Sequence, residues 1–176
     1  MKQAGIFFGS SSGKTAAIAS RIQDKMGSDK ADLWDVEVSS PEELLGYEVL
    51  ILGIPTWGIG KVQEDWEHFM SRLEDFDLSG KKVALFGLGD QESYPETFAD
   101  ALGKLYEVLQ KTGCSFTGSW PVAGYSFEGS AAVKGGRFVG LVLDEENQPD
   151  LTNERLDKWL KDIFTSTPKQ NVYHGR

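Results

Sequence analysis

The pattern of apolar and polar residues predicts alternating strands and helices along the chain. Short apolar runs at 6–8, 49–54 and 83–86 are typical of buried strands, and Pro55 is expected to end the second run. Residues 33–38 predict a further strand. Apolar residues at helical spacing predict four helices: Ile18, Ile22 and Met26; Trp66, Phe69, Met70 and Leu73; Phe98, Leu102, Leu105 and Leu109, with Pro95 near the first turn; Leu156, Trp159, Leu160, Ile163 and Phe164. This alternation favours an α/β fold with a mostly parallel sheet.

The last strand is expected in two pieces. Phe116 begins an apolar segment that reaches about Trp120, and residues 138–143 resemble its resumption after an interruption. The segment from Thr165 onward has no apolar period and predicts a frayed tail. With 176 residues, the chain suits a single domain, placed at 1–166, followed by a flexible tail at 167–176.

Composition excludes several classes of protein. The chain has 18 Lys and Arg against 27 Asp and Glu, a formal net charge of −9. This charge argues against general nucleic-acid binding and against docking on anionic lipid. Cys114 is the single cysteine, so an internal disulfide and a cysteine-based metal site are excluded, and a half-buried structural thiol is expected. No metal site is expected, and the lack of a signal-peptide pattern or a long apolar run predicts the cytoplasm.

Residues 9–15, Gly-Ser-Ser-Ser-Gly-Lys-Thr, join the first strand to the first helix. Ligands of open parallel sheets bind outside the carboxyl ends of the strands. Glycines allow close approach, hydroxyls donate, and a helix N-terminus favours an anion, so the loop predicts a phosphate site. A serine-rich helix cap is the structural alternative. A P-loop nucleotidase is disfavoured because Phe8 stands where that motif needs its first glycine.

Two further loops carry an aromatic residue beside glycines. Trp57 lies in residues 54–60, and Tyr94 lies in residues 87–95. An aromatic side chain on such a loop offers a stacking face for a planar ligand. The alternatives are that Trp57 covers the end of the sheet and that Tyr94 staples a helix N-terminus. Together with the serine-rich loop on the same rim, the two aromatics predict a mononucleotide with a flat ring.

These motifs resemble those of the long-chain flavodoxins, over nearly everything from Gly5 to Phe164. The family's phosphate loop matches residues 10–15, its Pro-Thr-Trp loop matches 55–57, and its Gly-x-Gly-Asp-Gln loop matches 87–91, followed by Tyr94. Residues 120–127 and 138–148 resemble the family's extra loop. The resemblance implies a flavodoxin-like three-layer α/β sandwich with a five-stranded parallel sheet, order 2-1-3-4-5, and a long-chain insertion in strand 5.

The resemblance also implies one non-covalently bound FMN. Residues 10–15 would hold the phosphate, and Trp57 and Tyr94 would sandwich the isoalloxazine. Thr56 is expected near the ribityl or phosphate end, and Glu146 at the ribityl hydroxyls. A peptide flip at Gly58 is a hypothesis for accepting the proton of the neutral semiquinone. The expected cofactor-binding residues are Ser10, Ser11, Ser12, Gly13, Lys14, Thr15, Pro55, Thr56, Trp57, Gly58, Ile59, Gly60, Leu88, Gly89, Asp90, Tyr94, Thr97 and Glu146.

The implied function is a low-potential one-electron carrier between a reductase and acceptor enzymes, without substrate turnover of its own. Implied partners are basic-surfaced redox proteins: an NADPH-dependent flavodoxin or ferredoxin reductase, pyruvate oxidoreductase, the nitrogenase reductase component or other ferredoxin-dependent systems. The protein itself is expected to be a monomer. A flavin-dependent NAD(P)H reductase on the same fold is the alternative, disfavoured because Trp57 and Tyr94 would cover both ring faces.

An acidic stretch follows the Trp57 loop. Residues 64–77 carry six carboxylates against Arg72, and we name this stretch the acidic cluster. A solvated helix face would explain such a run. Its place beside Trp57 favours a second interpretation, in which it flanks the exposed flavin edge and steers basic partners.

Overall fold

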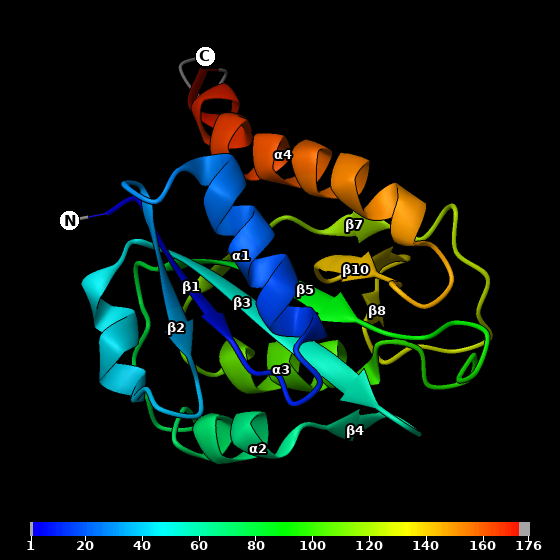
Figure 1. Cartoon of the computed structure of the whole chain (residues 1–176). Coiled ribbons are helices and arrows are strands. Elements are labelled where there is room, and N and C mark those ends of the chain that lie inside the picture. Colours follow the sequence, from blue (N-terminus) through cyan, green and yellow to red (C-terminus); the bar gives the residue numbers. More distant parts are fainter. Residues whose placement is uncertain (1, 173–176) are drawn as a thin grey trace.

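Parallel strands form the centre of the molecule in this computed structural model, which describes residues 2–172 (Figure 1). Strand β1 (Ala4–Phe8) pairs with β2 (Ala31–Asp35) on one side and with β3 (Val49–Trp57) on the other. Strand β5 (Lys82–Leu88) pairs with β3. Strands β1, β3 and β5 are mostly apolar and largely buried, which is why their sequences contain continuous apolar runs.

The outer position of the sheet is shared by two short strands. Strand β6 (Ser115–Thr117) pairs in parallel with Lys82–Ala84 of β5, and β10 (Leu141–Leu143) pairs in parallel with Phe86–Leu88. They are therefore two halves of one interrupted strand, and the predicted order 2-1-3-4-5 with an insertion in strand 5 is confirmed.

The insertion forms a small antiparallel sheet. Strand β9 (Arg137–Phe138) pairs with β7 (Trp120–Pro121) and with β8 (Val133–Lys134). The expectation that 138–143 is one resumed strand is therefore wrong, because Phe138 pairs opposite Trp120 and the parallel strand resumes only at Leu141. A short apolar run does not distinguish a buried hairpin strand from a buried parallel strand.

Helices cover both faces of the central sheet. Helices α1 (Lys14–Met26) and α4 (Thr152–Val172) lie on one face, and α2 (Glu64–Ser71) and α3 (Asp100–Gln110) lie on the other (Figure 1). Each presents its apolar positions inward; in α1, for example, Ile18 and Ile22 are buried. Two short 3-10 helices, η1 (Pro41–Gly46) and η2 (Pro149–Leu151), and the two-residue strand β4 (Lys61–Val62) complete the described elements.

Several predicted ends of elements are wrong. Strand β3 does not end at Pro55 but continues to Trp57. Proline is tolerated there because β1 ends opposite Gly53, so no strand on that side pairs with Pro55 and its missing N–H breaks no ladder bond. Helix α3 begins at Asp100, so Phe98, expected in the helical stripe, precedes the helix, and Pro95 lies in the segment before it. Within the described residues, no helix is long and apolar enough to cross a membrane.

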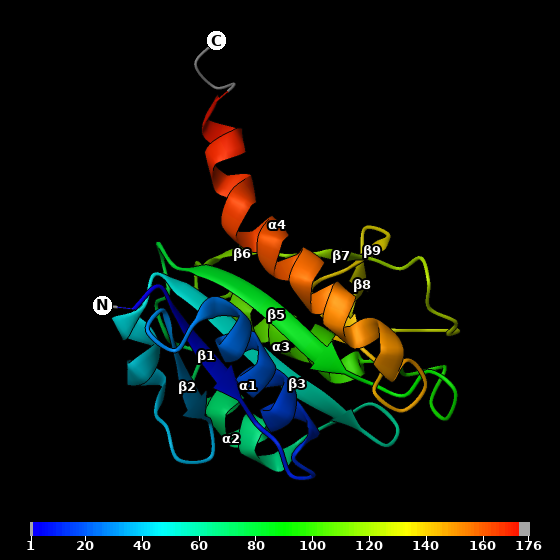
Figure 2. The same ribbon diagram turned by 45° about the horizontal axis from the view of Figure 1, so that its top comes forward.

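Helix α4 continues to Val172, beyond the expected frayed start at Thr165, and its far end projects past the sheet (Figure 2). A nucleated helix can propagate without an apolar stripe, which explains this error. The domain boundary at residue 166 stays a prediction, and residues 173–176 lie outside the described residues.

Candidate functional site

A cavity of about 310 Å³ lies at the carboxyl ends of β1, β3 and β5. We name it the carboxyl-edge cavity. Its walls come from the three predicted loops and from the turn that follows β10. The lining residues are Ser12, Lys14, Thr15, Pro55, Thr56, Trp57, Gly58, Leu88, Gly89, Asp90, Tyr94, Glu145 and Glu146. The sheet therefore brings together loops that are far apart in the sequence.

One end of the cavity is the start of α1. Gly13 is the N-cap residue with φ +91°, a left-handed conformation that favours glycine, and no side chain caps the helix. The first intrahelical bond runs from the Ala17 N–H to the Gly13 carbonyl, 3.0 Å away. The N–H groups of the first turn are therefore available to an external acceptor, as anion sites at helix N-termini require.

Two serine hydroxyls of the same loop accept hydrogen bonds through their oxygens and keep their own hydrogens available. The Ser10 Oγ accepts the Gly13 N–H at 2.9 Å, and the Ser11 Oγ accepts Gln63 Nε2 at 3.0 Å. A hydroxyl whose oxygen already accepts one bond still has its own hydrogen to donate. This end of the cavity thus combines backbone donors, hydroxyl donors and the Lys14 ammonium, which suits an anion such as a phosphate.

The other end of the cavity is aromatic. Trp57 and Tyr94 are 41% and 39% exposed, although each is large and mostly apolar. Trp57 ends β3 opposite Lys61 of β4, and Tyr94 follows β5 in a turn closed by its N–H to the Asp90 carbonyl, 3.0 Å away. Two exposed aromatic rings on the wall of one cavity suit a flat ring system.

The Trp57 loop turns on two glycines. Gly58 has φ +49° and Gly60 has φ +71°, and the Gly60 N–H donates to the Gly58 carbonyl at 3.0 Å. Gly60 is buried against Thr97 and Asp100, and its carbonyl accepts Lys104 Nζ at 2.6 Å. Space beside Gly58 is open, since a Cβ there would meet no atom within 4 Å.

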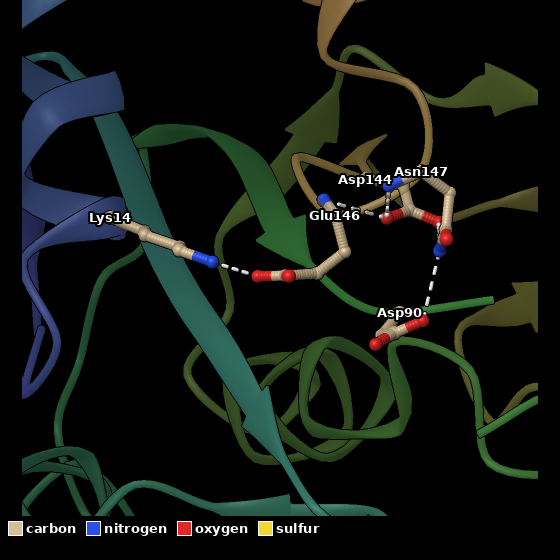
Figure 3. Close-up of polar contacts among 5 residues, drawn as sticks. All are labelled: Lys14, Asp90, Asp144, Glu146 and Asn147. Carbon is tan, nitrogen blue, oxygen red and sulfur yellow. Dashed lines mark hydrogen bonds and ion pairs between the residues drawn. The ribbon is translucent and has the colours of Figure 1, made fainter. Parts of the chain in front are cut away.

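A buried carboxylate organises the turn after β10. Asp144 is fully buried, and its oxygens accept the N–H groups of Gln91, Glu146 and Asn147 and the side-chain amides of Gln91 and Asn147. Asn147 Nδ2 also donates to Asp90 Oδ1 at 2.9 Å (Figure 3). The turn is therefore tied to the loop after β5. Burial alone would raise the pKa of Asp90, but hydrogen bonds from Ser93 and Asn147 hold it below its usual value.

Twelve of the expected cofactor-binding residues line the cavity. Six do not. Ser10, Ser11 and Gly13 shape the loop around the start of α1, and Gly60 and Thr97 pack behind the Trp57 loop. Ile59 is 78% exposed and is not among the residues that line this cavity. The cofactor contacts of all eighteen stay predictions.

The structure adds residues that sequence patterns missed. Glu145 lines the cavity, and its place beside Glu146 was the only available signal. Gln63 and Asp144 act through long-range hydrogen bonds, which no local pattern encodes. Thr56 has a further role, since its Oγ1 accepts the Ala101 N–H at the start of α3, 3.0 Å away.

Cys114 has the surroundings of a structural thiol. Cys114 is half-buried, its Sγ lies 3.5 Å from the Leu109 carbonyl, and burial raises its pKa, as expected of a structural thiol. No group of three or more His, Cys, Asp or Glu within residues 2–172 is arranged to hold a metal ion.

Comparisons with known proteins agree with this geometry. The family model described as flavodoxin matches residues 6–159. The chain belongs to the flavodoxin family. Flavodoxin 1 of Salmonella typhimurium is 51% identical over 160 residues, covering 90% of this chain and 91% of that protein. The flavodoxin of Synechocystis is 46% identical over 164 residues, covering 93% and 96%.

A solved structure shows the same fold. The Fusobacterium nucleatum flavodoxin bound to flavin mononucleotide superposes with a TM-score of 0.87 at 34% identity, covering 93% of this chain and 97% of that chain. Flavodoxins are FMN-binding electron-transfer proteins that work with redox partner proteins and do not turn over a substrate of their own. The predicted family, fold class, cofactor and non-enzymatic role are therefore confirmed.

Proposed function

We propose that this flavodoxin carries single electrons at low potential between a reductase and acceptor enzymes, with its FMN in the carboxyl-edge cavity. The observation that carries the proposal is that the two ends of this cavity differ. One end has hydrogen-bond donors that suit an anion, and the other has two exposed aromatic rings. A ligand with a phosphate monoester at one end and a flat ring at the other matches these two ends. Bound FMN supplies the one-electron chemistry.

Different residues would bind the phosphate and the ring of FMN. Ser12, Lys14, Thr15 and the first N–H groups of α1 would hold the phosphate. Trp57 and Tyr94 would stack on the ring, and backbone groups at Gly58 to Gly60 and at Gly89 and Asp90 would meet its polar edge. A single ring held between two aromatics leaves no open face for a nicotinamide, which favours a carrier over an NAD(P)H reductase.

Charge supports a low potential. The chain has a net charge of −9, and Asp90, Glu145 and Glu146 line the cavity itself. Negative charge and apolar stacking near a bound group raise the free energy of its anionic, fully reduced form. The second electron therefore leaves at low potential.

Charge also supports the kind of partner. In the acidic cluster, Glu64 and Glu67 are exposed at the start of α2, which follows β4, the strand that pairs with Trp57. Glu74, Asp75 and Asp77 are also exposed but precede β5, so they lie toward the amino edge of the sheet. The carboxylates at the start of α2 would attract basic redox proteins to the aromatic end of the cavity. An NADPH-dependent reductase would donate electrons to this flavodoxin, and a pyruvate oxidoreductase or the nitrogenase reductase component would be the other redox partner. The flavodoxin itself would act as a monomer in the cytoplasm.

Stepwise anaerobic reduction of the purified protein, followed by its visible spectrum, tests this function. We expect one FMN per chain, two resolved one-electron steps and a second step at low potential. NADPH added without a reductase should leave the spectrum unchanged. A two-electron reduction in one step, or direct oxidation of NADPH, would contradict the proposal.

A further inference from the structure

Lys14 and Glu146 form an ion pair within the carboxyl-edge cavity, between Lys14 Nζ and Glu146 Oε2 (Figure 3). Lys14 is the first residue of α1, and Glu146 lies in the turn after β10. The pair therefore joins the serine-rich loop to a segment 132 residues away. The proposed phosphate position and this ion pair share the same end of the cavity.

The two backbones are fixed, whereas the two side chains are not buried. The N–H groups of Glu146 and Asn147 donate to Asp144 Oδ1 at 3.1 and 3.0 Å, and Asp144 is fully buried. Lys14 belongs to the first turn of α1. The side chains of Lys14 and Glu146, by contrast, are 50% and 47% exposed. A change of partner at Lys14 therefore needs only side-chain rotation, which is fast.

An incoming phosphate changes the electrostatics of this pair. A phosphate monoester carries roughly −1.5 to −2 charges at pH 7, more than one carboxylate. The Lys14 ammonium attracts this phosphate, whereas the Glu146 carboxylate repels it. A lysine between the two anions gains more from the phosphate, provided that its contact with Glu146 is given up.

We propose that Lys14 exchanges Glu146 for the FMN phosphate when the cofactor binds. In the apoprotein, Glu146 holds Lys14 beside the phosphate position, and it competes with the phosphate for the Lys14 ammonium. The pair thereby sets how strongly this flavodoxin prefers FMN to riboflavin, which lacks the phosphate. The inference rests on the proposed function, because it assigns this end of the cavity to the phosphate.

The chain offers a matched control. Lys25 Nζ pairs with Asp157 Oδ1 at 2.7 Å, so a second α1 lysine contacts a carboxylate from the C-terminal part of the chain. Asp157 is not among the residues that line the cavity. Asp157→Asn therefore removes one negative charge from a partner of an α1 lysine, as Glu146→Gln does, without changing the phosphate end.

The test is a titration of the apoprotein with FMN and with riboflavin, followed by flavin fluorescence. Glu146→Gln should bind FMN about threefold more tightly, and Lys14→Met about fivefold more weakly, with riboflavin binding unchanged in both. In the Lys14→Met background, the gain from Glu146→Gln should fall below about 1.5-fold. The gain should also shrink in about 0.5 M salt. Asp157→Asn should match wild type throughout.

Three results would overturn the exchange. An equal gain from Glu146→Gln with and without Lys14 would mean simple repulsion between Glu146 and the phosphate. Weaker binding of both flavins by Glu146→Gln would mean that Glu146 contacts the ribityl chain instead. Unchanged FMN binding by Lys14→Met would mean that Lys14 never reaches the phosphate. Failure of the wild-type chain to bind either flavin would be a different result, because it would remove the proposed function itself.

Discussion

Gln63 donates its side-chain amide to the hydroxyl of Ser11, with 3.0 Å between Nε2 and Oγ. The same amide donates to Asp65 Oδ2 at 2.7 Å, while Gln63 Oε1 is buried without a hydrogen-bond partner among the described residues. Such an unsatisfied oxygen costs about 1–3 kcal/mol. We infer that this arrangement is kept because Gln63 Nε2 donates to the Ser11 oxygen. The Ser11 hydroxyl hydrogen then stays available to donate to an anion.

Gln63→Glu should therefore weaken FMN binding about tenfold and leave riboflavin binding nearly unchanged. A carboxylate accepts where the amide donates, so it would draw the Ser11 hydrogen away from the phosphate and add negative charge. Fluorescence titration with both flavins measures the effect. Gln110→Glu on the exposed side of α3 is the control for the added charge. Equal losses for both flavins would instead indicate a distorted loop.

Trp57→Ala and Tyr94→Ala should each weaken FMN and riboflavin binding by about 10- to 100-fold, because stacking on an aromatic side chain contributes about 1–3 kcal/mol per ring. Both side chains are about 40% exposed, so each substitution should lower the free energy of unfolding of the apoprotein by less than about 1 kcal/mol. Titration and urea unfolding of the same samples separate the two effects. A large loss of apoprotein stability would show that the rings serve the fold.

The sheet and the three cavity loops could be predicted from sequence because each depends on local signals. Continuous apolar runs identify strands buried on both faces, and loops at the carboxyl ends of parallel strands meet at one edge. Phe138 shows the limit of this reasoning, since its apolar neighbourhood suits either a hairpin or a parallel strand.

The supports of the site could not be predicted in this way. Asp144 has an ordinary acidic neighbourhood in the sequence, yet its burial and its bonds to Gln91 join segments 53 residues apart. Gln63 reaches Ser11 across 52 residues. Hydrogen bonds of this kind depend on how helices and loops pack on the sheet, and periodicity contains no information about that packing.

Gly58→Ala should narrow the gap between the two one-electron potentials of the bound flavin by roughly 90–170 mV, because destabilising the half-reduced state by about 1–2 kcal/mol lowers the first potential and raises the second. Gly58 has φ +49°, where an L-residue costs about 1–2 kcal/mol, and a tenfold change in a one-electron equilibrium corresponds to about 59 mV. The added methyl group meets no atom within 4 Å, so a clash cannot account for the change. Potentiometric titration measures the gap. An unchanged gap would rule out a conformational role for this residue.

Tyr47→Phe should lower the free energy of unfolding by about 1 kcal/mol at pH 7. The Tyr47 hydroxyl donates to Asp32 Oδ2 at 2.5 Å and accepts Trp34 Nε1 at 2.8 Å. Burial and the Asp32 bond raise the pKa of Tyr47 to about 12, and the Tyr47 hydroxyl is the main cause of the lowered pKa of Asp32.

The pH dependence of this difference follows from the two shifts. A raised tyrosine pKa stabilises the fold below about pH 10, and this contribution is lost as the pH rises toward 12. A lowered aspartate pKa stabilises the fold above about pH 4, and this contribution is lost on acidification. Urea unfolding of both proteins should therefore show the largest difference between about pH 5 and 9. A difference independent of pH would mean that packing dominates.

Reversal of charge in the acidic cluster should slow electron transfer to a basic acceptor such as cytochrome c. Glu64 and Glu67 are the suitable pair, because both are exposed, whereas Asp65 accepts a hydrogen bond from Gln63 and its replacement would also disturb the serine-rich loop. We expect Glu64→Lys with Glu67→Lys to lower the second-order rate constant about tenfold at low salt, with a shallower salt dependence. Stopped-flow mixing measures both quantities.

The control for this pair lies on α4. Glu154→Lys with Asp157→Lys makes the same change in net charge at exposed positions that do not line the cavity. At about 0.1 M salt, where the Debye length is about 10 Å, steering by a local surface predicts that the α4 variant keeps most of the wild-type rate, since exposed charges farther than this from the contact are screened. Equal slowing by both variants would show that partners respond to the net charge of the whole molecule and not to the carboxylates at the start of α2.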